Sequence, residues 1–330
     1  MLKFTDRGIY CPQADLYIDP WLPVDRAVVT HGHSDHARWG MGRYLCHTHT
    51  APILRLRLGE DITVQAVSYD EPVTENGVRI SLHPAGHIIG SAQVRLEYRG
   101  EVWVVSGDYK LLPDGVSTPF VPVRCHHFVT ESTFGLPVYR FQEPEAVIRD
   151  ISGWALQNAG EGLNTVLLAY ALGKSQILLH HLRTEGQPLL LHGAVANVNA
   201  ALETAGFRFP GSRAATGAGS SPVEGAVIVA PPSALGSPWL RRFSPYRIAM
   251  CSGWMQLRGA RRRRGVDRGF VLSDHGDWEQ LNEAVDATGA EHVYVTHGYE
   301  APFAQWLRER KGCRAYEVHL QGDETEEGDL

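Results

Sequence analysis

The sequence contains little cysteine, and none of it is arranged to form a metal site or a disulfide framework. Its 330 residues include five cysteines, an odd number, scattered from Cys11 to Cys313 without a Cys-x-x-Cys pair. Thiolate zinc sites and disulfide-rich secreted domains both need paired cysteines at short spacings. We therefore expect reduced and mostly buried thiols.

Long apolar runs are also missing. No stretch approaches the ~18 consecutive apolar residues of a membrane-spanning helix, and the segment Met1-Leu2-Lys3-Phe4-Thr5-Asp6 lacks the apolar core of a signal peptide. The expected location is cytoplasmic, with no membrane partner. Hydrophobic residues make up 43% and charged residues 21%, which predicts a globular chain long enough for two domains.

Net charge is weakly informative about the substrate. The chain carries a formal charge of −6, yet the run Arg261-Arg262-Arg263-Arg264 is strongly basic and the last ten residues are acidic. A local basic patch can contact phosphates whatever the overall charge is. A nucleic-acid substrate is therefore not excluded.

The most informative stretch that is present is His31-Gly32-His33-Ser34-Asp35-His36, which directly follows the apolar run Ala27-Val28-Val29. Imidazole and carboxylate are ligands that Zn²⁺, Mn²⁺ and Fe²⁺ accept. The end of a buried strand lets alternate side chains converge on one point. This stretch predicts a metal-binding cluster.

Two kinds of secondary structure alternate along the chain. Short strands punctuated by glycine and proline are predicted before about residue 130. From about Glu143 to Ala230, helices alternate with buried strands, which is typical of a small parallel α/β unit. A last helix and strand series follows Gly269.

Other polar residues recur where a predicted strand ends. Any one of them would more often be structural, but five share this context. Each can serve as a metal ligand or an acid/base group, and they are His87, Asp108, Glu131, His275 and His297.

These residues resemble the motifs of the metallo-β-lactamase superfamily and, within it, of the β-CASP nucleases. The resemblance runs in order through Asp19, His31-x-His33-x-Asp35-His36, Gly86-His87, Gly107-Asp108, Glu131-Ser132-Thr133, Ser273-Asp274-His275 and Thr296-His297. It implies an α/β fold: an αββα metallo-β-lactamase sandwich with an inserted α/β β-CASP domain. The sandwich would comprise residues 1–141 and 269–330, and the insert residues 142–268.

The resemblance also implies a dinuclear site holding two divalent ions, with zinc expected and manganese as the alternative. His31, His33 and His87 would hold one ion and Asp35, His36 and His297 the other, while Asp108 bridges them and Asp19 supports the site. Such a pair of ions can share a hydroxide that attacks phosphorus. His275, paired with Glu131, would then be the general acid, and Asp35 would take part in catalysis as a ligand.

Among β-CASP proteins, the chain looks closest to the bacterial ligase-associated DNA exonucleases, relatives of Artemis-type repair nucleases. This predicts a 5′-end-directed exonuclease on single-stranded or end-containing DNA, working with an ATP-dependent DNA ligase and a helicase of a repair cluster. His297 instead resembles the RNA-processing members, which carry histidine at this motif where Artemis-type members carry valine. In the other direction, Gly173-Lys174 resembles the sequence found in DNA-cleaving members. A ribonuclease is therefore the alternative, and a non-catalytic nucleic-acid scaffold or a small-molecule hydrolase is a lesser one.

Contacts to the substrate phosphates are predicted from charge and helix position. Lys174 and Ser175 begin a predicted helix, whose first amides favour a phosphate, and Lys174 would read a terminal 5′-phosphate. Arg262 and Arg263 would grip the backbone by charge. His47 and His49 mimic a ligand pair but precede a predicted helix, so they are left out of the site.

Overall fold

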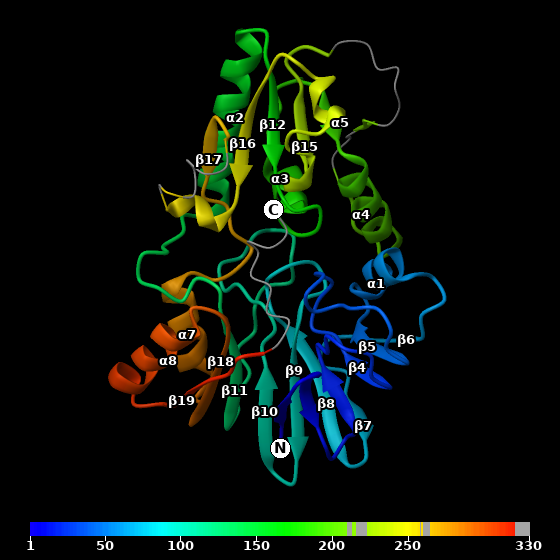
Figure 1. Ribbon diagram of the computed structural model, residues 1–330, viewed down its shortest axis with the longest axis vertical. Coiled ribbons are helices and arrows are strands. Elements are labelled where there is room, and N and C mark those ends of the chain that lie inside the picture. Colours follow the sequence, from blue (N-terminus) through cyan, green and yellow to red (C-terminus); the bar gives the residue numbers. More distant parts are fainter. Residues whose placement is uncertain (210–212, 216–222, 258, 260–264, 321–330) are drawn as a thin grey trace. The chain divides into compact units, whose positions relative to one another are not determined.

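The computed structural model describes residues 1–209, 213–215, 223–257, 259 and 265–320. The chain forms two compact units. The first comprises Met1–Arg140 and the segment that begins at His275, and the second comprises Phe141–Asp274 (Figure 1). The predicted insert, 142–268, lies inside the second unit. This unit continues to Asp274 because β17 (Arg268–Phe270) pairs with β16 (Tyr246–Cys251).

The first unit begins with a six-stranded sheet in the order β1-β2-β3-β4-β5-β6. Its first three strands form antiparallel pairs, and the pairs from β3 to β6 are parallel. The strands are β1 (Lys3–Thr5), β2 (Gly8–Cys11), β3 (Leu16–Ile18), β4 (Arg26–Val28), β5 (Arg43–His47) and β6 (Val64–Val67).

A seven-stranded sheet follows in the order β19-β18-β11-β10-β9-β8-β7. The strands are β7 (Val73–Glu75), β8 (Val78–Pro84), β9 (Ala92–Tyr98), β10 (Glu101–Val105), β11 (His127–Ser132), β18 (His292–Gly298) and β19 (Arg314–Glu317). Because β10, β11, β18 and β19 pair in parallel, their carboxyl ends meet at one edge of the sheet. This edge carries Asp108, Glu131 and His297.

Alternating side chains pack the first unit into four layers. Trp103 and Val105 of β10 join a core shared with strands of the first sheet, whereas Val102 and Val104 point to the other face and pack with helices. Those helices are α7 (Trp278–Thr288) and α8 (Glu300–Trp306), which continues into a π-helical turn at Leu307–Lys311. On the other side, α1 (Ala51–Leu58) packs on the first sheet. The predicted αββα sandwich is confirmed.

The second unit has a sheet in which every pair is parallel, in the order β14-β13-β15-β12-β16-β17. The strands β13 and β15 are apolar along their whole length, as expected where helices cover both faces. The remaining strands are β12 (Asn164–Leu168), β13 (Leu189–Leu191), β14 (Arg213–Ala214) and β15 (Val227–Ala230). The helices are α2 (Pro144–Gly160), α3 (Lys174–His181), α4 (Gly193–Thr204) and α5 (Pro238–Arg241), with 3-10 turns at Pro232–Ala234 and Gly253–Gln256.

Two expectations from composition also hold. All five cysteines are free, and four of them are buried. None of the helices in the described part of the chain is long and apolar enough to cross a membrane.

Candidate metal centre

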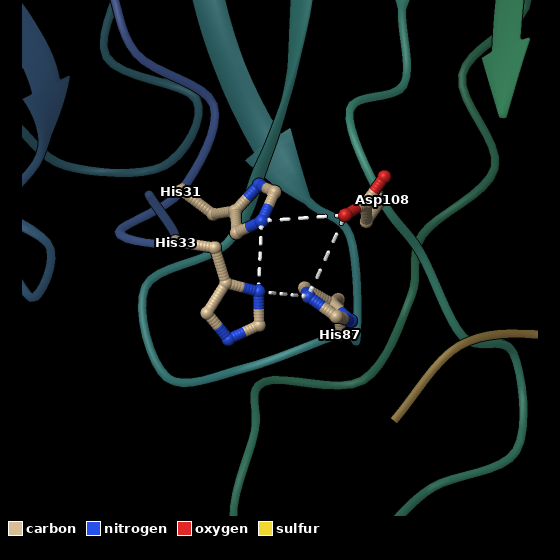
Figure 2. Close-up of side chains that lie close together, drawn as sticks. All are labelled: His31, His33, His87 and Asp108. Atoms are coloured by element: carbon tan, nitrogen blue, oxygen red, sulfur yellow. Dashed lines mark hydrogen bonds and ion pairs between the residues drawn. The ribbon is translucent and has the colours of Figure 1, made fainter. Parts of the chain in front are cut away.

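Four side chains of the first unit converge in a compact cluster. His31 and His33 come from the loop after β4, His87 follows β8, and Asp108 follows β10. Their ligand atoms all lie within 4.8 Å of one another (Figure 2). His33 Nδ1 is 3.2 Å from His31 Nε2 and 3.0 Å from His87 Nε2. Asp108 Oδ2 is 3.4 Å from His31 Nε2, so four potential ligands surround one small volume.

A second group of possible ligands shares a residue with the first. Asp35, His36 and Asp108 also offer ligand atoms within 4.8 Å of one another. His36 Nε2 lies 3.5 Å from Asp35 Oδ2 and 3.4 Å from Asp108 Oδ2. Asp108 therefore lies between the two groups, where a bridging carboxylate was predicted.

The donor set fits divalent metal ions. His36 Nε2 is a buried nitrogen to which the described part of the chain offers no hydrogen-bond partner, although two carboxylates are near. In the first cluster, three imidazole nitrogens face one another, and a neutral imidazole carries only one N–H. A cation that accepts nitrogen and oxygen lone pairs would satisfy this arrangement, and imidazole with carboxylate suits zinc or manganese.

The buried charges within the cluster compensate one another. Burial lowers the pKa of His31 well below its usual value, and the neighbouring His36 lowers it further. For His36 burial acts in the same direction, but Asp108, Asp35 and Asp19 outweigh it and raise the pKa of His36 well above its usual value. Although burial opposes it, His36 holds the pKa of Asp108 well below its usual range. Asp108 is therefore ionised, as a ligand must be.

Asp19 supports the cluster from outside. Its carboxylate lies 2.8 Å from His36 Nδ1 and accepts hydrogen bonds from Thr30 N at 2.8 Å and Thr30 Oγ1 at 2.6 Å. A carboxylate on one imidazole nitrogen fixes the ring and directs the other nitrogen to a metal. The supporting role of Asp19 stays a prediction, and the contribution of Thr30 was not foreseen.

Two glycines allow the ligand-bearing loops to bend. Gly86 has φ +76°, and a Cβ there would lie 2.1 Å from the Lys110 carbonyl oxygen. Gly107 has φ +56°, and its Cβ would lie 2.7 Å from Thr30 Oγ1. No L-residue fits at these distances without backbone movement, so the glycines set the approach of His87 and Asp108.

His297 lies at the edge of the second group and does not complete it. Its ring stacks on that of His36 with centroids 5.2 Å apart, and its Nδ1 lies 3.0 Å from Thr296 Oγ1. Its backbone has φ +51°, a conformation that costs free energy in a non-glycine residue and is often found at functional sites. The role of His297 as a ligand stays a prediction.

His275 and Glu131 form the expected pair. His275 Nδ1 lies 3.0 Å from Glu131 Oε2 and 3.2 Å from Oε1, and both side chains are buried. Glu131 Oε1 also accepts a hydrogen bond from Tyr109 N at 2.7 Å. The ring of His275 lies 4.5 Å from that of His87, between centroids. The pair therefore sits beside the first cluster, and its catalytic role stays a prediction.

The structure buries both residues of the predicted phosphate site, Lys174 and Ser175. Lys174 is only 1% exposed, and its Nζ lies 2.7 Å from Asp274 Oδ1. Ser175 is buried, and its hydroxyl donates to the Tyr170 carbonyl at 2.6 Å. At the start of this helix, the amide of Gly173 donates to Gln176 Oε1 at 2.7 Å. This part of the helix start is therefore filled by the chain itself.

The two remaining predicted phosphate contacts, Arg262 and Arg263, lie outside the described residues. His47 and His49, left out of the site, do not appear among the metal-type clusters found in the described residues. His47 instead stacks on Tyr69, with centroids 3.6 Å apart.

Comparisons with known proteins agree with this geometry. No family profile matches the sequence. The chain is 35% identical over 321 residues to a protein named Probable DNA ligase from Opitutus terrae, covering 96% of this chain and 31% of the relative. It is 32% identical over 121 residues to Endoribonuclease ysh-1 from Neurospora crassa, covering 35% of this chain and 14% of the relative. The chain thus spans less than a third of the length of either relative.

A solved structure shares the fold. A protein of unknown function from Enterococcus faecalis V583 superimposes with a TM-score of 0.58 at 10% identity, over 82% of this chain and 74% of that protein. The ordered motifs, the αββα layers of the first unit, the α/β unit inserted in its sequence and the similarity to an endoribonuclease lead to one conclusion. The chain belongs to the β-CASP family of the metallo-β-lactamase superfamily.

Proposed function

We propose that this protein is a metal-dependent phosphodiesterase that cleaves DNA as an exonuclease in DNA repair. The observation that carries the chemistry is the placement of the His275–Glu131 pair beside two ligand groups that share Asp108. Two metal sites can clamp a phosphate. A buried acid/base pair next to them can serve the leaving oxygen, as phosphodiester hydrolysis requires.

The ligand groups would hold two divalent ions, which would supply an activated water and neutralise charge on the phosphate. The chain itself supplies the proton for the leaving group. His275 donates its Nδ1–H to the Glu131 carboxylate, which favours the imidazolium and leaves Nε2–H available. Tyr109 N holds Glu131 in place, so the pair is oriented before substrate arrives.

A DNA substrate is supported by the relative named Probable DNA ligase, which aligns with 96% of this chain. A nuclease and a ligase in one polypeptide would trim and seal the same strand. A separate ATP-dependent DNA ligase and a helicase are accordingly the partners we propose.

A ribonuclease of the same chemistry is the second candidate. Two observations favour it, the histidine at position 297 and the similarity to a protein named Endoribonuclease ysh-1. The two candidates share the same proposed ligands and differ in the nucleic acid that they cleave.

The decisive experiment is a nuclease assay on matched single strands of DNA and RNA, each labelled at the 5′ or the 3′ end, with zinc or manganese. We expect cleavage of DNA, with mononucleotides released from one end. Faster cleavage of RNA would favour the ribonuclease, and no cleavage of either with both metals bound would refute the proposal. The predicted 5′ direction loses its supporting residue with the burial of Lys174, and the two labels measure the direction directly.

A further inference from the structure

The loop that carries the histidine motif also carries a strongly exposed tryptophan. Trp39 is 74% exposed, and the next most exposed large apolar side chain in the described part of the chain is Leu156 at 51%. Trp39 follows the metal-type residue His36 by three positions. An indole exposed in this way contributes little burial free energy to the fold, and its apolar surface is available to a binding partner.

The backbone on both sides of Trp39 is fixed by one buried side chain. The Tyr44 hydroxyl donates to the Arg38 carbonyl at 2.9 Å and accepts from Met41 N at 3.1 Å. Tyr44 is fully buried on β5. Trp39 therefore stands on a loop whose two ends are tied to the core, and the ordering entropy of the loop is lost on folding rather than on binding.

The same loop packs beside a cavity that reaches the second ligand group. A Cβ on Gly40 would lie 3.2 Å from Pro23 Cγ, and Trp21, two residues before Pro23, lines a cavity of about 30 Å³ together with Asp35 and His36. Leu22, between Trp21 and Pro23, is 44% exposed. Trp39 and Leu22 are thus exposed apolar side chains on two loops that meet at Gly40 and Pro23, near residues that line this cavity.

We propose that Trp39 stacks on a nucleobase of the single strand whose phosphate lies at the metal centre, so that it positions the strand for cleavage. This inference rests on the proposed nuclease function and adds the contact that binds the base. An exposed indole on a loop whose backbone is tied on both sides offers the flat apolar surface that a base covers, and such stacking tolerates any base sequence. Exposed aromatic platforms of this kind serve single-stranded DNA and RNA alike.

The test compares Trp39→Ala and Trp39→Phe with the wild-type protein on a set of single strands that each lack one base. Tyr316→Ala is the matched control, because Tyr316 is an exposed aromatic residue, 42% exposed, on the edge strand β19. Stacking is worth about 1 to 3 kcal/mol per base. We therefore expect Trp39→Ala to raise KM for the intact strand about 5- to 150-fold with little change in kcat, and Trp39→Phe to raise it far less.

The strands without a base identify the contact. One of these strands should lack the stacked base, at a fixed distance from the cleaved bond. On it, the KM of the wild-type protein should rise to the value that Trp39→Ala shows on the intact strand, and the KM of Trp39→Ala should rise no further. An unchanged KM for Trp39→Ala, or an equal loss on every strand, would overturn the inference while wild-type cleavage upheld the nuclease. A wild-type protein that cleaves no strand would overturn the nuclease and the inference together.

Discussion

The two units of this protein each bury charged side chains, and they do so in opposite ways. In the second unit, Lys174 and Asp274 are almost fully buried and form an ion pair of 2.7 Å. In the first, His31, His36, His87 and Asp108 are buried with nitrogen facing nitrogen and a carboxylate shared between groups. The Lys174–Asp274 pair is complete in charge, with one positive group against one negative group, while the cluster in the first unit gains from a cation. Whether buried charges are balanced by partners within the chain, more than burial itself, distinguishes a structural ion pair from a candidate metal site.

The sharpest way to break this comparison is to remove a ligand from the incomplete cluster. His31→Ala or Asp108→Asn should abolish cleavage, by more than ~10³-fold, and lower the metal content, because metal catalysis supplies several kcal/mol of barrier lowering. Metal analysis and a nuclease assay measure both. His180→Ala, an exposed histidine of α3, is the control. Two retained ions with near-normal activity would rule the ligand assignment out.

The next largest effect concerns the buried pair that lies beside the cluster. His275→Ala should keep the metals and slow cleavage by roughly 10² to 10⁴, the usual worth of a general acid. The loss of cleavage rate should be smaller on a nitrophenyl phosphodiester, because its leaving oxygen departs without a proton. Glu131→Gln should show the same pattern more weakly, because the imidazole stays in place. Equal losses on both substrates would make His275 structural or a ligand.

The complete pair of the second unit should affect stability and leave end preference unchanged. Lys174→Met leaves Asp274 buried without its cation, and breaking such a pair costs about 3 to 5 kcal/mol of unfolding free energy. The double variant Lys174→Met/Asp274→Leu should recover much of this loss, since apolar side chains tolerate the site. Thermal unfolding measures the cost. A lost preference for 5′-phosphorylated ends at unchanged stability would restore Lys174 as a phosphate contact.

The smallest effect is expected at the carboxylate that supports the cluster without entering it. Asp19→Asn keeps the size of the side chain but weakens the contact with His36 Nδ1, and such supporting groups change metal affinity by about 10- to 100-fold. Asp19→Asn should lower the affinity for the ion at Asp35, His36 and Asp108, and the ion at His31, His33 and His87 should stay bound. Competition with a chelator measures it, and simultaneous loss of both ions would show that the two groups are not separable.

Much of the site was predictable because it follows strand ends. His87, Asp108, Glu131 and His297 each come directly after an apolar strand pattern, and parallel strands bring such positions to one edge. Tyr246–Cys251 escaped prediction because a short apolar run does not distinguish a strand from a helix. The burial of Lys174 was not predictable either, since its partner Asp274 is a hundred residues away in the sequence. Trp39 carries no pattern at all, because only exposure in the fold marks it.

The glycines behind the ligands bear on mutational tolerance. At Gly107, a Cβ would meet Thr30 at 2.7 Å in a backbone conformation that L-residues rarely adopt. At Gly86, it would meet a carbonyl oxygen at 2.1 Å. A saturation scan selecting for activity should therefore find both codons as restricted as those of His87 and Asp108, and even Gly→Ala should fail. In such a scan, two residues without a side chain would be indistinguishable from catalytic ones.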